Sequence, residues 1–316
     1  MWKYRAFRLA ATLVPAVPIW LARPLVSFAA FFIWAFARGP RRQVERNLRH
    51  IPALANDPER LYWATRGVFQ HMALNYLDFF RGPTISDKEL KAGWTIVNQE
   101  AYDRAMAEGR GLILLTGHFG NFEFAASRLG ALGYKLMTPV EHMQPEALFQ
   151  LFCQIRQHHN LRLVAADSRD SLREMFDALK RGEVLLYLVD RYVMGSSAEV
   201  PFFGEPAKMP TGPIALALKS GAPVMVAYSW REGPGRSYGA FVPLDINAGE
   251  ETAEATATES MSAGGSGSAP TRTATRARSS ELVLRAQAQF LQTMEAAIEQ
   301  HPEQWVATLS PIWDVE

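Results

Sequence analysis

Cysteine is nearly absent from this sequence: Cys153 is the single one among 316 residues. One cysteine cannot form a disulfide within a chain, so nothing requires an oxidising compartment, and a reducing, cytosolic setting fits best. Cys153 lies in an apolar run between Leu148 and Ile155. A free cysteine in such a run is typically buried, so we expect a structural thiol and not a nucleophile.

Net charge is also small, because 33 basic and 32 acidic side chains leave a formal charge of +1. A composition this balanced does not predict binding to a polyanion, so nucleic acid is not an expected partner. With 48% apolar residues, the chain is long enough to bury one large hydrophobic core or two modest ones.

Acidic residues are missing altogether from the first 44 positions, where seven basic residues occur: Lys3, Arg5, Arg8, Arg23, Arg38, Arg41 and Arg42. Two apolar runs rich in tryptophan and phenylalanine, 9–21 and 24–37, lie between these charges. As a helix each run would rise about 20 Å, less than the roughly 30 Å hydrocarbon core of a bilayer. Arg23 with Pro24 separates the two runs, and proline tends to interrupt a helix.

Aromatic side chains beside basic ones are typical of a membrane surface. We therefore expect residues 1–40 to form a membrane anchor, either one hydrophobic helix or a helical hairpin that lies in the interface. Three alternatives remain: a single spanning helix that tolerates Arg23, a cleaved signal peptide, and a core helix of a soluble domain.

Beyond a helical region at 41–81, apolar strands alternate with helices up to the C-terminus. The expected strands are 111–117, 134–140, 161–165, 183–189 and 222–228, and the expected helices are 122–132, 145–158, 172–179, 211–219 and 281–300. This alternation predicts an α/β fold in one domain, 41–316, with a mixed, largely parallel central sheet flanked by helices. The stretch 247–280 consists mainly of Ala, Thr, Ser, Gly and Glu, and we expect it to be a disordered insertion.

The most informative segment is TGHFGNFEF at 116–124. It places His118 just after a buried strand, at the carboxyl end, where open α/β sheets bind ligands. It places Glu123 in the first turns of the next helix, and no other histidine of the chain has an acid five residues later. A bare His-x4-acid pattern is weak, so its position after the strand is what favours a functional site.

Acylation of an alcohol needs a base that takes the hydroxyl proton, and neutral imidazole suits this near neutral pH. A carboxylate on the other ring nitrogen would fix the tautomer, so we expect His118 as the base and Glu123 as its partner. Gly117 and Gly120 would let backbone and substrate approach closely, and N–H groups at the helix start could hold the developing oxyanion. The alternative is that His118 is a structural or helix-capping histidine.

Several segments resemble, in the same order, the lipid A biosynthesis lauroyl/myristoyl acyltransferases and the related phosphatidylinositol mannoside acyltransferases of the bacterial lysophospholipid acyltransferase-like superfamily. They are RRQVERNL at 41–48, the motif at 118–123, Arg156, VDR at 189–191, PFFG at 201–204, KMPTGP at 208–213 and HPEQW at 301–305. The C-terminal stretch WVATLSPIW at 305–313 lacks the His and basic residues that follow this tryptophan in typical lipid A enzymes, and it is more similar to the mannoside-acylating branch.

The resemblance implies transfer of a fatty acyl chain to a hydroxyl of a membrane glycolipid, at the cytoplasmic face of the inner membrane. The acceptor is a lipid A precursor or a phosphatidylinositol mannoside, and the donor is acyl-CoA or acyl-carrier protein. Carried over to this chain, the resemblance makes His118 and Glu123 catalytic. It assigns substrate binding to Arg156, Asp190, Arg191, Gly120 and Asn121.

Arg156 suits this role because a guanidinium binds phosphate in bidentate fashion. Asp190 ends an apolar strand, where we expect it to pair with Arg156 or Arg191. No bound cofactor is expected, and no metal, because the adjacent His158 and His159 do not share a helix face.

Two other functions are compatible with this sequence. One is a lipid thioesterase or hydrolase, although no Gly-x-Ser-x-Gly elbow of the serine type is present. The other is a catalytically inactive membrane protein that binds lipid in the same groove. Release of free fatty acid without a glycolipid acceptor would distinguish the hydrolase from the transferase.

Overall fold

The computed structural model describes the chain except for residues 1, 169, 234, 247–271 and 314–316. Its centre is a seven-stranded sheet with the strand order β1-β9-β8-β2-β5-β3-β4. The strands are β1 (Trp94–Val97), β2 (Leu112–Thr116), β3 (Leu136–Val140), β4 (Leu161–Ala165), β5 (Val184–Leu188), β8 (Val224–Arg231) and β9 (Ser237–Leu244).

Strands β8, β2, β5, β3 and β4 run parallel, β9 is antiparallel to β8, and β1 is parallel to β9. The predicted mixed, largely parallel sheet is therefore confirmed. All residues of β2 are buried, as expected of a strand covered on both faces.

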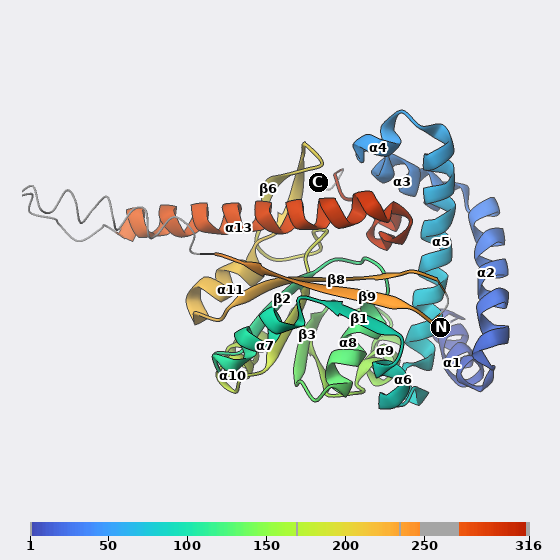
Figure 1. Ribbon diagram of the computed structural model, residues 1–316, viewed down its shortest axis with the longest axis horizontal. Coiled ribbons are helices and arrows are strands. Elements are labelled where there is room, and N and C mark those ends of the chain that lie inside the picture. The colour runs from blue at the N-terminus through green and yellow to red at the C-terminus, as the bar shows by residue number, and fades with distance from the viewer. Residues whose placement is uncertain (1, 169, 234, 247–271, 314–316) are drawn as a thin grey trace, which may run out of the picture.

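Helices cover both faces of the sheet (Figure 1). On one face α7 (Gln99–Ala107) and α8 (Phe122–Ala131) pack on a core that includes Tyr102, Leu114 and Leu129. On the other face α10 (Ser171–Lys180), α11 (Gly212–Ser220) and the long α13 (Arg272–Gln300) pack on a larger core. Helix α9 (Glu146–Arg156) lies beside β4 and buries Cys153, as predicted.

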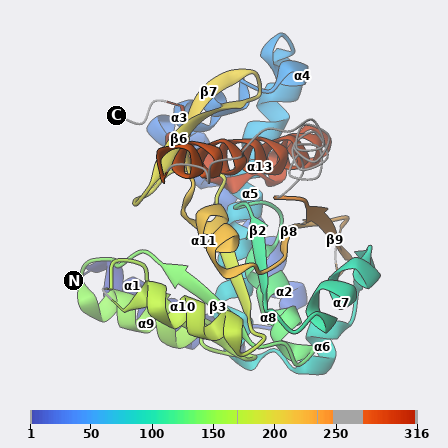
Figure 2. The same ribbon diagram turned by 90° about the vertical axis from the view of Figure 1, so that its left-hand side faces the viewer.

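A separate hairpin, β6 (Ser197–Phe202) and β7 (Glu205–Pro210), lies against α13 (Figure 2). Together with β1 and β9 it was not predicted from the sequence. Strand β1 has no fully buried residue, and the exposed and half-buried residues of such edge strands give a weak apolar pattern.

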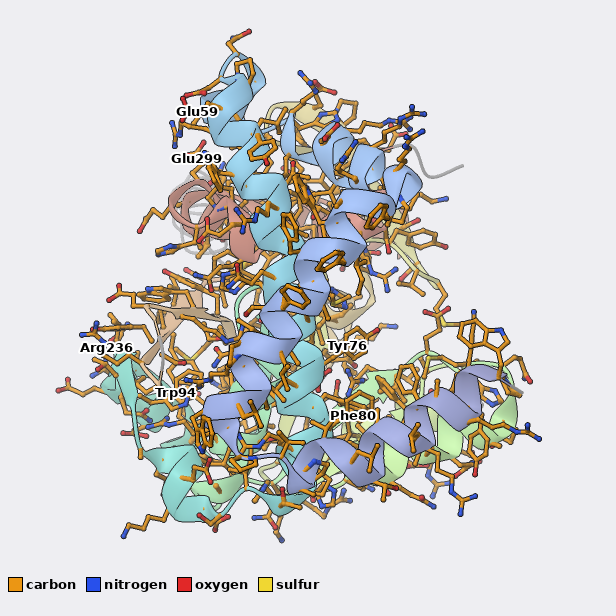
Figure 3. The ribbon with its side chains drawn as sticks, turned by 90° about the vertical axis from the view of Figure 1, so that its right-hand side faces the viewer. Glu59, Tyr76, Phe80, Trp94, Arg236 and Glu299 are labelled. Carbon is orange, nitrogen blue, oxygen red and sulfur yellow. The ribbon has the colours of Figure 1, made fainter. Side chains whose placement is uncertain are left out.

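The segment before the first strand is helical: α1 (Trp2–Leu13), α2 (Ile19–Phe36), α3 (Arg38–Leu48), α4 (Pro52–Ala55), α5 (Pro58–Arg81) and α6 (Asp87–Lys91). Helix α2 lies along α5, as Figure 3 shows. The two helices are antiparallel, because the Trp34 ring lies 5.2 Å from Tyr62 and the Arg66 guanidinium lies 5.3 Å from Phe31. Helix α1 turns away from α2 (Figure 3) and packs against the far end of α5.

One expectation about this region was wrong. Arg23 and Pro24 do not separate two apolar helices, because α2 runs through Pro24. The break comes earlier, at the short 3₁₀ helix Val14–Ala16 and at Pro18, which precedes the first residue of α2. Pro24 removes a single backbone donor in the second turn of α2, a loss that the rest of the helix tolerates.

A second expectation concerned the insertion at 247–280. Residues 247–271 of it lie outside the described residues, but 272–280 belong to α13 and are therefore helical and not disordered. Alanine and arginine are frequent in this stretch, and both have high helix propensity.

Candidate active site

His118 and Asp190 meet at the carboxyl ends of two neighbouring parallel strands. The register of β2 and β5 pairs Thr116 with Leu188, so the residues two positions beyond each strand also lie side by side. The His118 ring nitrogen Nδ1 is 2.8 Å from Asp190 Oδ1, and the backbone N–H of His118 donates to Asp190 Oδ2 at 2.8 Å. The same carboxylate therefore holds both the ring and the main chain of His118.

Asp190 is fully buried and receives a third hydrogen bond, from the Trp305 indole N–H to Oδ2 at 3.1 Å. Burial by itself raises the pKa of this carboxyl. The electrostatic interaction with His118 and the hydrogen bonds from His118 and Trp305 outweigh it, so the pKa of Asp190 lies below its usual value. Asp190 is therefore ionised at neutral pH.

The C-terminal segment that contains Trp305 is hydrogen-bonded to the loop that contains His118. The N–H of Val306 donates to the His118 carbonyl at 2.9 Å, and the N–H of Gly120 donates to the Gln304 carbonyl at 3.0 Å. Trp305 itself is fully buried. Trp305 was not predicted as a site residue from its chemistry, and its place in the HPEQW segment was the signal that could have indicated it.

Two glycines make this loop possible. A Cβ at Gly120, where φ is +62°, would lie 1.7 Å from the carbonyl oxygen of Ser229. A Cβ at Gly117 would lie 2.9 Å from Asp190 Oδ2. Any side chain at either position would push the His118 loop away from β8 or from Asp190.

We expected Glu123 to be the partner of His118, but the structure does not pair these two side chains. It forms an ion pair with Arg156, in which Arg156 Nε donates to Glu123 Oε2 at 3.0 Å and Nη2 donates to the other carboxylate oxygen. The reason is local: Glu123 lies in the first turn of α8 and faces α9, whereas His118 precedes α8 and faces the end of β5. The guanidinium of Arg156 also lies over the Phe152 ring, 4.0 Å from its centroid.

The predicted pairing of Asp190 with Arg156 or Arg191 is wrong for the same geometric reason. Asp190 is occupied by His118 and Trp305, and Arg156 by Glu123. Arg191 follows Asp190 directly and is half-buried. Asn121 is buried and donates to the Ser237 hydroxyl at 3.0 Å, so it links the loop to the start of β9.

A buried network on the other side of the loop was not predicted. Arg231, at the end of β8, donates to Asn75 Oδ1 and Asp78 Oδ2 of α5, both at 2.7 Å. It also donates to the Gly120 carbonyl at 3.3 Å. Burial lowers the pKa of Arg231, and burial followed by the charge of Arg231 lowers the pKa of His71 to about 3.

An apolar pocket lies between α8 and the sheet, next to this site. Its empty space amounts to about 570 Å³, part of which is open to solvent. Its wall includes Thr116, Phe122, Leu188, Ser229 and Gly239. Phe122 connects the pocket to the catalytic histidine candidate, because its ring packs edge-on against His118 at 5.4 Å.

Comparison with known proteins agrees with this architecture. The model of the bacterial lipid A biosynthesis acyltransferases matches residues 2–264. The chain belongs to this family. It is therefore an acyltransferase, and the relation to this family that the sequence suggested is confirmed.

Individual members of the family are moderately similar. A phosphatidylinositol mannoside acyltransferase of Mycobacterium tuberculosis (strain ATCC 25618 / H37Rv) is 29% identical over 80% of this chain and 79% of its own length. The enzyme of the same name from Mycolicibacterium smegmatis is 26% identical over 76% of this chain and 79% of its own length. The lipid A biosynthesis lauroyltransferase of Escherichia coli K12 is 31% identical, but over 52% of this chain and 54% of its own length.

Within the described ranges, no group of three or more His, Cys, Asp or Glu side chains is placed to hold a metal ion. The expectations that the enzyme needs neither a metal nor a bound cofactor remain predictions.

Proposed function

We propose that this acyltransferase moves a fatty acyl chain from the thioester of acyl-CoA or acyl-carrier protein to a hydroxyl of a membrane glycolipid, with His118 as general base. One observation carries the proposal: a histidine bound to a buried carboxylate packs against Phe122, a residue that lines an apolar pocket. The first feature suits activation of an alcohol, and the second suits a fatty acyl chain.

The two ring nitrogens of His118 have different roles in this mechanism. Because Nδ1 faces the ionised Asp190, its proton stays there and Nε2 is the basic nitrogen. Nε2 takes the proton of the acceptor hydroxyl while the oxygen attacks the thioester carbon. The tetrahedral intermediate then expels the thiolate, which takes the proton back from the imidazolium, so the products are an ester and a free thiol.

Asp190 is the partner of this base in the proposed mechanism. It stabilises the imidazolium and fixes the tautomer, the role that the aspartate has in Ser-His-Asp sites. Glu123 and Arg156 then form the neighbouring wall of the substrate site and do not orient His118. Helix α8 begins four residues after His118, and the unpaired N–H groups of its first turn are the donors nearest in sequence for the oxyanion.

The acyl chain occupies the apolar pocket in this proposal. Small residues on α8 and on the facing strands leave the space: Ala125, Ala126, Ala227, Gly239 and Ala240. Phe122 lies between this space and His118 and would contact the first carbons of the chain. Burial of a methylene in such a pocket contributes about 0.8 kcal/mol, so a long acyl chain binds here mainly through its hydrocarbon.

The acceptor is a glycolipid, and mannosylated phosphatidylinositol is the first candidate. The relatives named for this substrate match about four-fifths of the chain, whereas the relative named for lipid A biosynthesis matches about half. Acyl-CoA and acyl-carrier protein present the same thioester arm, so either can serve as the donor in this mechanism.

The enzyme acts at the cytoplasmic face of the membrane, held there by α1 and α2. By length and composition alone, helix α2 could cross a bilayer. Its inner face, with Ala22, Ala30 and Trp34, is buried. Its outer face exposes large apolar side chains: Trp20, Leu25, Phe28, Phe32 and Phe36.

A spanning arrangement conflicts with this packing. Because α2 lies along α5, a membrane-crossing α2 would draw α5 into the hydrocarbon (Figure 3). Helix α5 carries Arg60, Arg66, Asp78 and Arg81, and each charge at the bilayer centre costs several kcal/mol. An α2 that lies in the plane of the interface exposes its outer face to lipid and keeps α5 in water.

The test is transfer of labelled palmitoyl from acyl-CoA and from acyl-carrier protein to mannosylated phosphatidylinositol and to a lipid A precursor. We expect His118→Ala to lower kcat by a factor of about 100 or more, as loss of a general base does. His142→Ala is the matched control, because His142 is a partly exposed histidine paired with Glu146. Release of free fatty acid alone would indicate a hydrolase, and full activity of His118→Ala would exclude His118 as the base.

A further inference from the structure

Arg23 is the single charged residue of the 18-residue helix α2. Its neighbours Trp20, Leu21 and Leu25 are exposed on the outer face, but Arg23 itself is half-buried. A charge in an apolar, lipid-facing helix is costly unless it is paired, and such residues commonly mark ligand sites. The proposed acyl transfer assigns no role to Arg23.

The packing of α2 on α5 determines what Arg23 faces. Trp34 lies opposite Tyr62, and Phe31 lies opposite Arg66. Continuing along these antiparallel helices places Arg23 opposite the turn of α5 that precedes and includes Asn75. Asn75 and Asp78 hold Arg231 there, and Arg231 in turn holds the carbonyl of Gly120. Arg23 is thus beside the network that supports the active-site loop.

The region around Arg23 and Arg231 has more positive than negative charge. Asp78 is engaged by Arg231 at 2.7 Å, and Glu123 is engaged by Arg156. Across the described residues, Arg23 has no hydrogen bond or ion pair with another side chain. Its charge also contributes, after burial, to lowering the pKa of Arg231. The guanidiniums of Arg23 and Arg231 therefore share one carboxylate, that of Asp78. The remaining positive charge can be balanced by a bound anion.

We propose that Arg23 binds the phosphate of the acceptor lipid and so sets the depth at which the acceptor's sugar reaches His118. This inference rests on the proposed glycolipid acyl transfer. A guanidinium matches a phosphate with two parallel hydrogen bonds. An in-plane α2 lies at the level of the lipid headgroups, where the phosphate of a membrane-held acceptor also lies.

The acceptor is favoured over bulk anionic lipid because of the side of α2 that carries Arg23. Bulk lipid meets the outer face, with Trp20, Phe28 and Phe36, whereas Arg23 lies on the flank toward α5 and the active-site loop. A phosphate bound on this flank belongs to a lipid whose headgroup is already at the catalytic site.

The experiment compares two acceptors in neutral phosphatidylcholine nanodiscs: mannosylated phosphatidylinositol and a mannosyl diacylglycerol, which lacks phosphate. We expect Arg23→Gln to raise the KM for the phosphate-bearing acceptor about tenfold or more, as loss of a charge-assisted hydrogen bond does. The KM for acyl donor and kcat/KM for the phosphate-free acceptor should stay within about twofold. Arg23→Lys should raise the KM for the phosphate-bearing acceptor less than Arg23→Gln does.

Arg38→Gln is the control, because it removes an equal charge from an exposed residue close to α2, the first residue of α3. Vesicle binding of both variants is measured with and without phosphatidylglycerol. Equal losses for both acceptors, accompanied by weaker vesicle binding in both variants, would assign Arg23 to bulk lipid and overturn the proposal. An unchanged KM in Arg23→Gln would overturn it too. If the wild type acylates neither acceptor, the proposed function itself fails.

Discussion

Two carboxylates lie near the active-site loop, and their surroundings differ. Asp190 is fully buried and accepts three hydrogen bonds, two from His118 and one from Trp305. Glu123 lies in the first turn of a helix, is partly open to solvent and is paired with Arg156. The histidine motif alone suggests Glu123 as the partner of His118. The structure shows that a residue 72 positions away along the chain has that place.

This difference shows that spacing along the sequence is a weaker guide to the partner of a histidine than the position of residues at the ends of adjacent parallel strands. A buried carboxylate must be compensated by nearby donors, so Asp190 can be stable only in the arrangement that also orients His118. Glu123 is compensated by a guanidinium and can remain in place without any imidazole. The two pairs should therefore respond differently to substitution.

Asp190→Asn should have the largest effect. The backbone of His118 and the indole of Trp305 both donate to Oδ2, so the asparagine carbonyl must take that position and its amide N–H must face His118 Nδ1. The ring then carries its proton on Nε2 and cannot act as base. We expect kcat to fall by about 10³- to 10⁴-fold with the fold retained, measured by initial rates and circular dichroism. A loss below tenfold would contradict the assignment of Asp190.

Glu123→Gln should have a smaller effect, about tenfold or less on kcat/KM, since it leaves His118 and Asp190 in place. The guanidinium of Arg156 loses its counter-charge and shifts in the substrate wall. A double-mutant cycle with Arg156→Gln should give a coupling free energy of about 0.5–3 kcal/mol from chemical denaturation. If Glu123→Gln instead abolishes activity like Asp190→Asn, the two carboxylates are not functionally distinct.

Trp305→Phe tests how much the hydrogen bond from the Trp305 indole to Asp190 contributes to the difference between the two carboxylates. Phenylalanine keeps the ring packed near Phe202 and Trp313 but removes the N–H donor. We expect kcat to fall by about tenfold and the pKa of Asp190 to rise toward its usual value.

The low folded pKa of Asp190 contributes stability above the unfolded carboxyl pKa of about 3.8, and this contribution is lost as the pH falls. The difference in unfolding free energy between wild type and Trp305→Phe should therefore shrink on acidification. Urea titrations at several pH values measure it, and a constant difference would show that the indole only fills space.

The smallest effect on activity is expected at His71, which lies away from both carboxylate pairs. Burial, then the charges of Arg231 and His301, lower its pKa from 6.5 to about 3. The unfolded chain thus binds one more proton below pH 6.5, so stability falls on acidification between these values, by at most about 1.4 kcal/mol per pH unit. His71→Gln should have a shallower pH dependence of unfolding, with kcat within a few-fold of wild type. An unchanged slope would mean that His71 is protonated in the folded protein.

The sequence by itself determined the α/β class, because buried strands such as 111–117 and amphipathic helices such as 145–158 are patterns of local composition. It also determined the position of His118 after a buried strand and the apolar, basic character of the N-terminus. These features depend on residues close together in the chain, where periodicity and turn residues act directly.

Only the tertiary structure decided which residues complete the site. Asp190 and Trp305 reach His118 because β2 and β5 are adjacent and the C-terminal segment crosses the loop, and no local pattern records strand order. The same holds for Arg231 at the end of β8 and for Arg23 on α2, whose surroundings depend on how α5 packs against the sheet and against α2. A residue's type is fixed by the sequence, but the partner of a buried charge is fixed by the long-range packing that removes it from water.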